Sequence, residues 1–171
     1  MRIECEITEQ DYVDFNLYHF SKSKEFIKSR LVILVLCPAL FAFITFNFSG
    51  SGSMFSNIIR VVLFAVIWII FYPIVQRSML INNVKKLLKD GKNKDLLGRH
   101  EFVFDEEGII ERTENAENRA KWAGIEKIVE TKKAIYLYNS SVSAYIIPSQ
   151  SFEKGEILAG FVEYLHKIAG K

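Results

Sequence analysis

The side chains that could carry chemistry in this chain are not spaced for catalysis. Its three histidines, His19, His100 and His166, are scattered, with no second histidine at helical spacing and no cysteine pair near them, so a zinc site is not indicated. The chain has no Gly-x-Ser-x-Gly elbow, no phosphate-binding loop and no dinucleotide-binding glycine pattern. The sequence therefore predicts no catalytic residue, no metal and no cofactor, and it favours binding over enzymatic activity.

Three carboxylates in a row, Asp105, Glu106 and Glu107, precede Gly108. A calcium loop would need Asp or Asn at alternating positions and a later bidentate Glu, and this pattern is missing. We therefore expect the solvated tip of a β-hairpin, in which Gly108 is free to adopt a positive φ.

One aromatic residue beside cations is the best candidate for contact with a partner. Trp122 follows Lys121 and Arg119, and a large aromatic next to positive charges is a common interface anchor. The alternative is that Trp122 belongs to the core, because Ile125 and Ile128 continue an apolar pattern from it. The sequence leaves both interpretations open and favours the core.

Two apolar runs, Leu31–Phe48 and Ile58–Val75, dominate the first half of the chain. Each reaches the roughly 18 residues that a helix needs to cross a bilayer. A buried hairpin in a soluble protein would have a wetter face on each helix, and neither run has one. We expect a transmembrane hairpin over residues 31–75 with one charge, Arg60. This side chain lies near the outer end, where it can reach the headgroups, and a transport role is the alternative.

Basic residues flank the hairpin, whereas the connector at residues 49–57 carries no charge. By the positive-inside rule, both termini should lie in the cytosol. An amphipathic helix should continue from the second run to Asp90 and stop at Gly91. Its lysines either serve as a plain anchor or contact anionic lipid, where each adds about 1 kcal/mol of attraction. These candidate lipid contacts are Lys85, Lys86 and Lys89.

The charge of the chain divides near its middle. Residues 1–99 carry a net charge of +5 and residues 100–171 a net charge of −3. The mildly acidic C-terminal part lacks the basic surface that nucleic-acid binding requires, which argues against nucleic acid as a partner. Cys5 and Cys37 cannot form a disulfide framework, so both should be free thiols facing a reducing cytosol.

The chain divides into four expected segments: 1–30, 31–75, 76–98 and 99–171. In the first, Ile3, Cys5 and Ile7 alternate with polar residues as in a half-buried strand. A helix should follow over residues 9–20, opened by a capping box of Thr8 and Asp11. Its aromatic face is expected to pack rather than to bind a base or cofactor. The residues of that face are Tyr12, Phe15, Tyr18 and His19.

The third segment, 76–98, should be the basic juxtamembrane helix and a short linker. In the last segment, 99–171, the pattern of apolar and turn residues predicts strands at 101–104, 109–113, 120–131, 134–138 and 142–147, and an amphipathic helix after Gly155. The expected fold class is therefore α+β: a two-helix membrane hairpin plus a small curved antiparallel sheet or barrel closed by a terminal helix. The N-terminal strand could join the edge of that sheet.

A family likeness is carried by the hairpin and by Thr8 to His19, Trp122 to Glu130, Tyr136 to Tyr138, Ile146 to Pro148, and Phe152. On these residues the chain resembles the YcxB-like bacterial membrane proteins. The C-terminal part is similar to pleckstrin-homology-like modules. The resemblance implies a pleckstrin-like barrel under a membrane anchor and brings no established catalytic residue. Members often have basic residues just after the proline, where this chain has Ser149 and Gln150.

These observations lead to three hypotheses. The first is a non-enzymatic protein of the bacterial inner membrane whose cytosolic domain binds a partner protein, since that domain is acidic. The second is a sensor of anionic lipid headgroups. The third is a subunit of an oligomeric membrane transport or enzyme complex, in which the chain would form homo-oligomers because two helices cannot enclose a conducting pathway.

Overall fold

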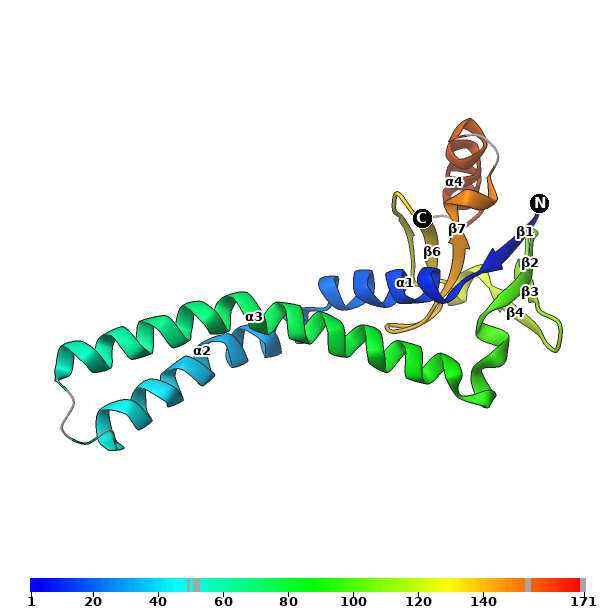
Figure 1. The fold of residues 1–171 in the computed structure, drawn as a ribbon. Coiled ribbons are helices and arrows are strands. Elements are labelled where there is room, and N and C mark those ends of the chain that lie inside the picture. The colour runs from blue at the N-terminus through cyan, green and yellow to red at the C-terminus, as the bar shows by residue number, and fades with distance from the viewer. Residues whose placement is uncertain (49, 51–52, 153–154, 170–171) are drawn as a thin grey trace. The chain divides into compact units, whose positions relative to one another are not determined.

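The computed structural model describes residues 1–48, 50, 53–152 and 155–169. It is an α+β structure with three short 3-10 turns at Gly91–Leu96, Trp122–Gly124 and Ser149–Ser151. Its strands and α-helices are, in order, β1 (Arg2–Ile7), α1 (Glu9–Lys22), α2 (Lys24–Phe48), α3 (Met54–Lys89), β2 (Gly98–Phe104), β3 (Gly108–Arg112), β4 (Glu117–Lys121), β5 (Lys127–Glu130), β6 (Ala134–Tyr138), β7 (Ala144–Pro148) and α4 (Gly155–Ala169) (Figure 1).

The chain forms two compact units. Met1–Asn16 and Val84–Lys171 together make one, which we call the mixed unit, and Leu17–Asn83 makes the other, the helical unit. The mixed unit is thus assembled from both ends of the sequence. Its N-terminal part contributes β1 and the first turns of α1.

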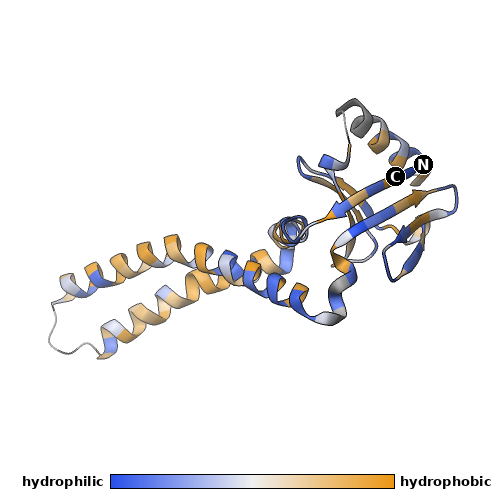
Figure 2. Ribbon diagram, turned by 45° about the vertical axis from the view of Figure 1, so that its right-hand side comes forward, coloured by the Kyte–Doolittle hydropathy of each residue, from blue (hydrophilic) through white to orange (hydrophobic). Residues whose placement is uncertain are grey.

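The helical unit contains two helices, α2 and α3, that are long and apolar enough to cross a membrane. Apolar residues extend along much of both helices (Figure 2). Their large side chains are left uncovered: Val35 is 69% exposed and Phe43 60%. A core helix of a soluble protein would bury such residues, so the exposure favours a lipid surrounding. Of the connector, Ser49, Ser51 and Gly52 lie outside the described residues.

Aromatic rings join the two helices within this unit. Phe41 of α2 stacks on Phe64 of α3 with 4.1 Å between ring centroids, and Trp68 and Tyr72 continue the stack along α3. Arg60 donates to the side-chain oxygen of the buried Asn57 over 3.3 Å. The one charge of the apolar runs is therefore hydrogen-bonded to its own helix.

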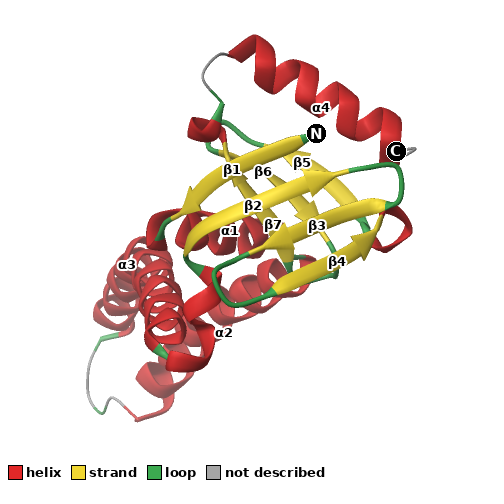
Figure 3. Ribbon diagram, turned by 90° about the vertical axis from the view of Figure 1, so that its right-hand side faces the viewer, coloured by secondary structure: helices red, strands yellow, loops and turns green. Residues whose placement is uncertain are grey.

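The strands of the mixed unit form two antiparallel sheets, ordered β1-β2-β3-β4 and β5-β6-β7 (Figure 3). β1 pairs with β2, so the N-terminal strand does join the C-terminal domain. The predicted alternation is confirmed, because Ile3, Cys5 and Ile7 are buried while their neighbours are exposed. The capping box is also confirmed: the amide of Thr8 donates to Asp11 over 2.9 Å, and the amide of Asp11 donates to the Thr8 hydroxyl over 3.2 Å.

Two expectations about the sheets are corrected. Among the described residues the strands form two separate sheets and no closed barrel. Residues 120–131 are not one strand, because the 3-10 turn Trp122–Gly124 separates β4 from β5 and carries the chain from one sheet to the other. Ala123 carries only a methyl group and Gly124 has no side chain, and Ile125 after the turn is fully buried.

The core lies between the two sheets and under α4. Phe102 of β2 meets Tyr145 of β7 edge-on at 6.0 Å, and Phe161 of α4 lies 5.1 Å from Phe104. Phe15 of α1 packs 5.2 Å from Tyr136, as expected for a packing residue. The side chains of residues 155–159, at the start of the expected amphipathic helix, are not among the described ones.

Candidate functional site

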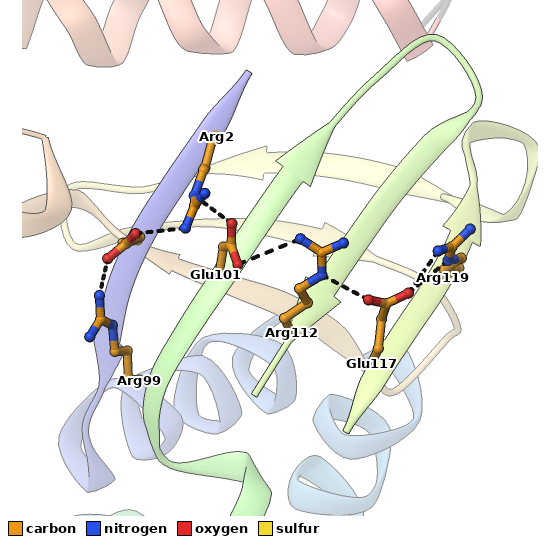
Figure 4. Close-up of polar contacts among 7 residues, drawn as sticks. Arg2, Arg99, Glu101, Arg112, Glu117 and Arg119 are labelled. Carbon is orange, nitrogen blue, oxygen red and sulfur yellow. Dashed lines mark hydrogen bonds and ion pairs between the residues drawn. The ribbon is translucent and has the colours of Figure 1, made fainter. Parts of the chain in front are cut away.

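The outward face of the four-stranded sheet carries a ladder of alternating charges (Figure 4). Glu4 of β1 binds Arg99 and Arg2, and Arg2 also binds Glu101. Arg112 lies 3.7 Å from Glu101 and 2.7 Å from Glu117.

The ladder ends at the candidate anchor residues of β4. Arg119 donates from two nitrogens to Glu117, over 2.8 and 2.9 Å, and Arg112 and Arg119 together lower the pKa of that carboxyl. These groups are exposed, and exposed pairs contribute about 0–1 kcal/mol each. The ladder therefore lies on a solvent-exposed outer face, on which Lys121 is exposed as well.

Trp122 lies in the core rather than on this face. Only 7% of the residue is exposed, its indole nitrogen donates to the carbonyl oxygen of Asp105 over 2.8 Å, and its ring lies parallel to Phe104 at 6.4 Å. The structure thus favours the core interpretation. It leaves Lys121 and Arg119 without a neighbouring exposed indole, so the trio does not form a single surface anchor.

The three candidate lipid-contact lysines differ in their surroundings. Lys85 makes an ion pair of 2.8 Å with Glu9 and lowers the pKa of that carboxyl. Lys86 and Lys89 are exposed. One of the three positive charges is therefore already matched within the mixed unit.

A pocket of about 160 Å³ opens beside the inward side of the four-stranded sheet. Its walls come from β1, α1, the turn after α3, β2, β3, β4 and β7. Among the described lining residues the formally charged ones are carboxylates, Asp95 and Glu111. The lining residues are Ile7, Tyr12, Asn93, Asp95, Leu96, His100, Glu111, Thr113, Ala116, Asn118, Ala144 and Ile146.

His100 and Glu111 form the polar centre of this pocket. The Nδ1 atom of His100 lies 3.0 Å from Oε1 of Glu111, and the amide of Asn118 donates to Oε2 of Glu111 over 3.2 Å. His100 is 3% exposed, and its Nε2 atom is closed to solvent with no partner among the described residues.

Cys5 lies opposite His100 in the strand pair, which raises the question of a thiol nucleophile. Burial raises the pKa of Cys5 to about 12, and the Glu111 carboxylate adds to the shift. The thiolate is the reactive form of cysteine, and it is scarce at neutral pH when the pKa is this high. Cys5 is therefore a buried apolar side chain rather than a nucleophile.

We predict that Cys5 resists alkylation in the folded protein. In a Cys37→Ala variant at pH 8, iodoacetamide should modify Cys5 about a thousandfold more slowly than in denaturant, because three pKa units remove that share of thiolate. A cysteine placed at Val142, which is 69% exposed, is the reactive control for alkylation; equal alkylation rates at both positions would contradict the prediction.

The raised pKa of Cys5 also predicts a contribution to stability that is complete below about pH 9 and declines as the pH rises toward 12.

The pocket was not predicted, because the histidines are scattered along the chain and their spacing indicates no site. His100 shares its strand phase with Phe102 and Phe104, and Glu111 shares the phase of Ile109, so both polar groups stood on an apolar face. That phase was visible in the sequence. The partner strand was not, because Asn118 meets Glu111 only through the register of β3 and β4.

The structure defines an α+β protein with two candidate membrane helices and a small two-sheet domain. Residues 104–165 match the family model described as YcxB-like protein, which confirms the expected resemblance over this part of the chain. Neither the curated proteins nor the solved structures give a significant match. The match begins at the last residue of β2, although the mixed unit also includes β1 and the rest of β2.

Proposed function

We propose that this chain is a non-enzymatic, membrane-anchored module that binds a partner protein through its mixed unit. The two apolar helices would anchor it in the bacterial inner membrane, with both termini in the cytosol as the flanking basic residues favour. The four-plus-three arrangement of antiparallel strands with a terminal helix supports a pleckstrin-homology-like fold for the mixed unit.

One observation carries the preference for a protein partner. Among the described lining residues of the pocket, the charges are the carboxylates Asp95 and Glu111. A phosphate-bearing headgroup needs cations or aligned N–H donors, and it would be repelled by carboxylates. The mixed unit therefore suits a ligand that is neutral or positive, as parts of protein surfaces are.

Position-specific crosslinking in whole cells tests this proposal. A photoreactive amino acid at Asn118, an exposed residue that lines the pocket, should give a discrete crosslinked protein. The same amino acid at Val142, which is 69% exposed, is the matched control and should not. Crosslinks to lipid alone at Asn118, or the same products at both positions, would contradict the proposal.

The headgroup-sensor alternative has its own readout, since Lys86 and Lys89 are exposed. In bilayers with and without anionic lipid, a headgroup sensor would show amide exchange around these residues that depends on lipid charge and is lost in a Lys86→Gln, Lys89→Gln variant. A protein-binding module predicts no such dependence in the mixed unit.

A further inference from the structure

We infer that the pocket around Glu111 receives one positively charged, hydrogen-bond-donating group, a guanidinium or ammonium on a basic side chain of the partner protein. The inference rests on the proposed function for the source of the group. Its chemistry rests on the pocket alone. Three observations carry it.

The first is an unmatched charge. Glu111 has only 13% of its side chain exposed, and its neighbours among the described residues are His100 and Asn118. On the outward face of the same sheet, Glu4, Glu101 and Glu117 are each bound by arginine. Among the described residues no lysine or arginine pairs with this largely buried carboxylate, so a cation supplied from outside is favoured at Glu111.

The second is the polar lining beside Glu111. Nε2 of His100 is a buried nitrogen with no partner in the described part of the structure, in a residue that lines the pocket. Asp95 adds a second carboxylate to the lining, where it accepts from Asn115 over 2.6 Å. The oxygens of the two carboxylates suit a ligand that donates several hydrogen bonds.

The third is size. The pocket volume of about 160 Å³ is roughly the volume that five water molecules occupy, at about 30 Å³ each. Pockets for drug-sized molecules and cofactors measure about 300–1,000 Å³. The pocket is therefore large enough to admit the end of a side chain. A metal ion is less suited, because the described residues contain no group of three or more ligating side chains.

Binding of short peptides to the full-length protein in lipid nanodiscs tests the inference. Acetyl-Gly-Arg-Gly-amide should bind about tenfold or more tightly than the same peptide with citrulline, which keeps the shape of arginine and removes the charge. Glu111→Gln should weaken arginine-peptide binding about tenfold or more, and Asp95→Asn should weaken it in the same direction. Glu117→Gln, a carboxylate on the outward face, is the matched control and should change it less than about twofold.

Equal binding of the two peptides, equal effects of Glu111→Gln and Glu117→Gln, or no binding at millimolar peptide would overturn the inference. Agmatine that binds more tightly than the arginine peptide would overturn the protein source of the group. A thermal-unfolding measurement on each variant keeps loss of binding distinct from loss of folding. If crosslinks at Asn118 form while the arginine peptide fails to bind, the inference falls and the proposed function stands. If the arginine peptide binds but no crosslinks form at Asn118, the preference of the pocket for a positively charged group stands and the proposed protein partner is overturned.

Discussion

A chain in which a flexible linker of about ten Gly and Ser residues replaces residues 17–83 should fold as a soluble, cooperative domain. This replacement removes the helical unit and keeps both parts of the mixed unit. Glu9 and Lys85 are in contact, and Asn16 lies about 10 Å farther along α1 at 1.5 Å per residue. A ten-residue flexible linker has an average span of about 17 Å, which is enough to close this gap.

The fragment 99–171 should not fold in the same way. It lacks five buried apolar side chains from the N-terminus, each worth about 1.5–3 kcal/mol, so the loss is roughly 7–15 kcal/mol. That is as large as the whole stability of a typical small domain. The missing side chains are Ile3, Cys5, Ile7, Val13 and Phe15.

Denaturant unfolding followed by circular dichroism compares the two chains. The linker variant should show one transition, and fragment 99–171 should show none. Within the linker variant, Phe15→Ala should cost about 3–5 kcal/mol, because Phe15 is buried against Tyr136 and Tyr138, and Val142→Ala at an exposed position should cost little. A cooperative transition of the same midpoint in fragment 99–171 would show that the N-terminal residues do not stabilise the domain.

Local patterns in the sequence predicted most elements because their causes are local. The strand at Ile3 to Ile7 and the helix opened by Thr8 depend on alternation and capping within a few residues. The strand Ala134–Tyr138 is a short apolar run, buried along its whole length and bounded by turn residues. The turn that divides residues 120–131 was not predicted, since Trp122, Ile125 and Ile128 give the same apolar pattern whether the segment is one strand or is divided by a turn. The turn at Trp122–Gly124 is required by the packing of two sheets, which no local pattern records.

The candidate site was less predictable than the fold because it is made by pairing. Trp122 was ambiguous by sequence and is placed in the core by its contact with Asp105, 17 residues away. His100 and Glu111 come together across β2 and β3, and the carboxylates of the outer face find their arginines across three strand pairs. Register decides these contacts, and a shift of one residue would reverse the two faces.

Gly108→Ala should be among the most destabilising single substitutions in the mixed unit. From the sequence, Gly108 was free to adopt a positive φ, but its φ is not positive. A Cβ atom at this position would lie 2.0 Å from the carbonyl oxygen of Ala120 and 2.9 Å from the Cα atom of Lys121. Both obstacles are backbone of β4, so β3 and β4 would have to separate. We expect a loss of about 3 kcal/mol or more, at the upper end for overpacked sites.

Two other glycines separate this steric cause from a conformational one. Gly98 has a φ of +99° with open space around it, so Gly98→Ala should cost about 1–2 kcal/mol through backbone strain alone. Gly124 has neither constraint, and Gly124→Ala should be neutral or slightly stabilising because it restricts the unfolded chain. Thermal unfolding of the three variants should rank their losses as Gly108, then Gly98, then Gly124. If Gly108→Ala unfolds at the same temperature as Gly124→Ala, β4 does not lie against β3 at this point, and the pairing that places Asn118 beside Glu111 would also be in error.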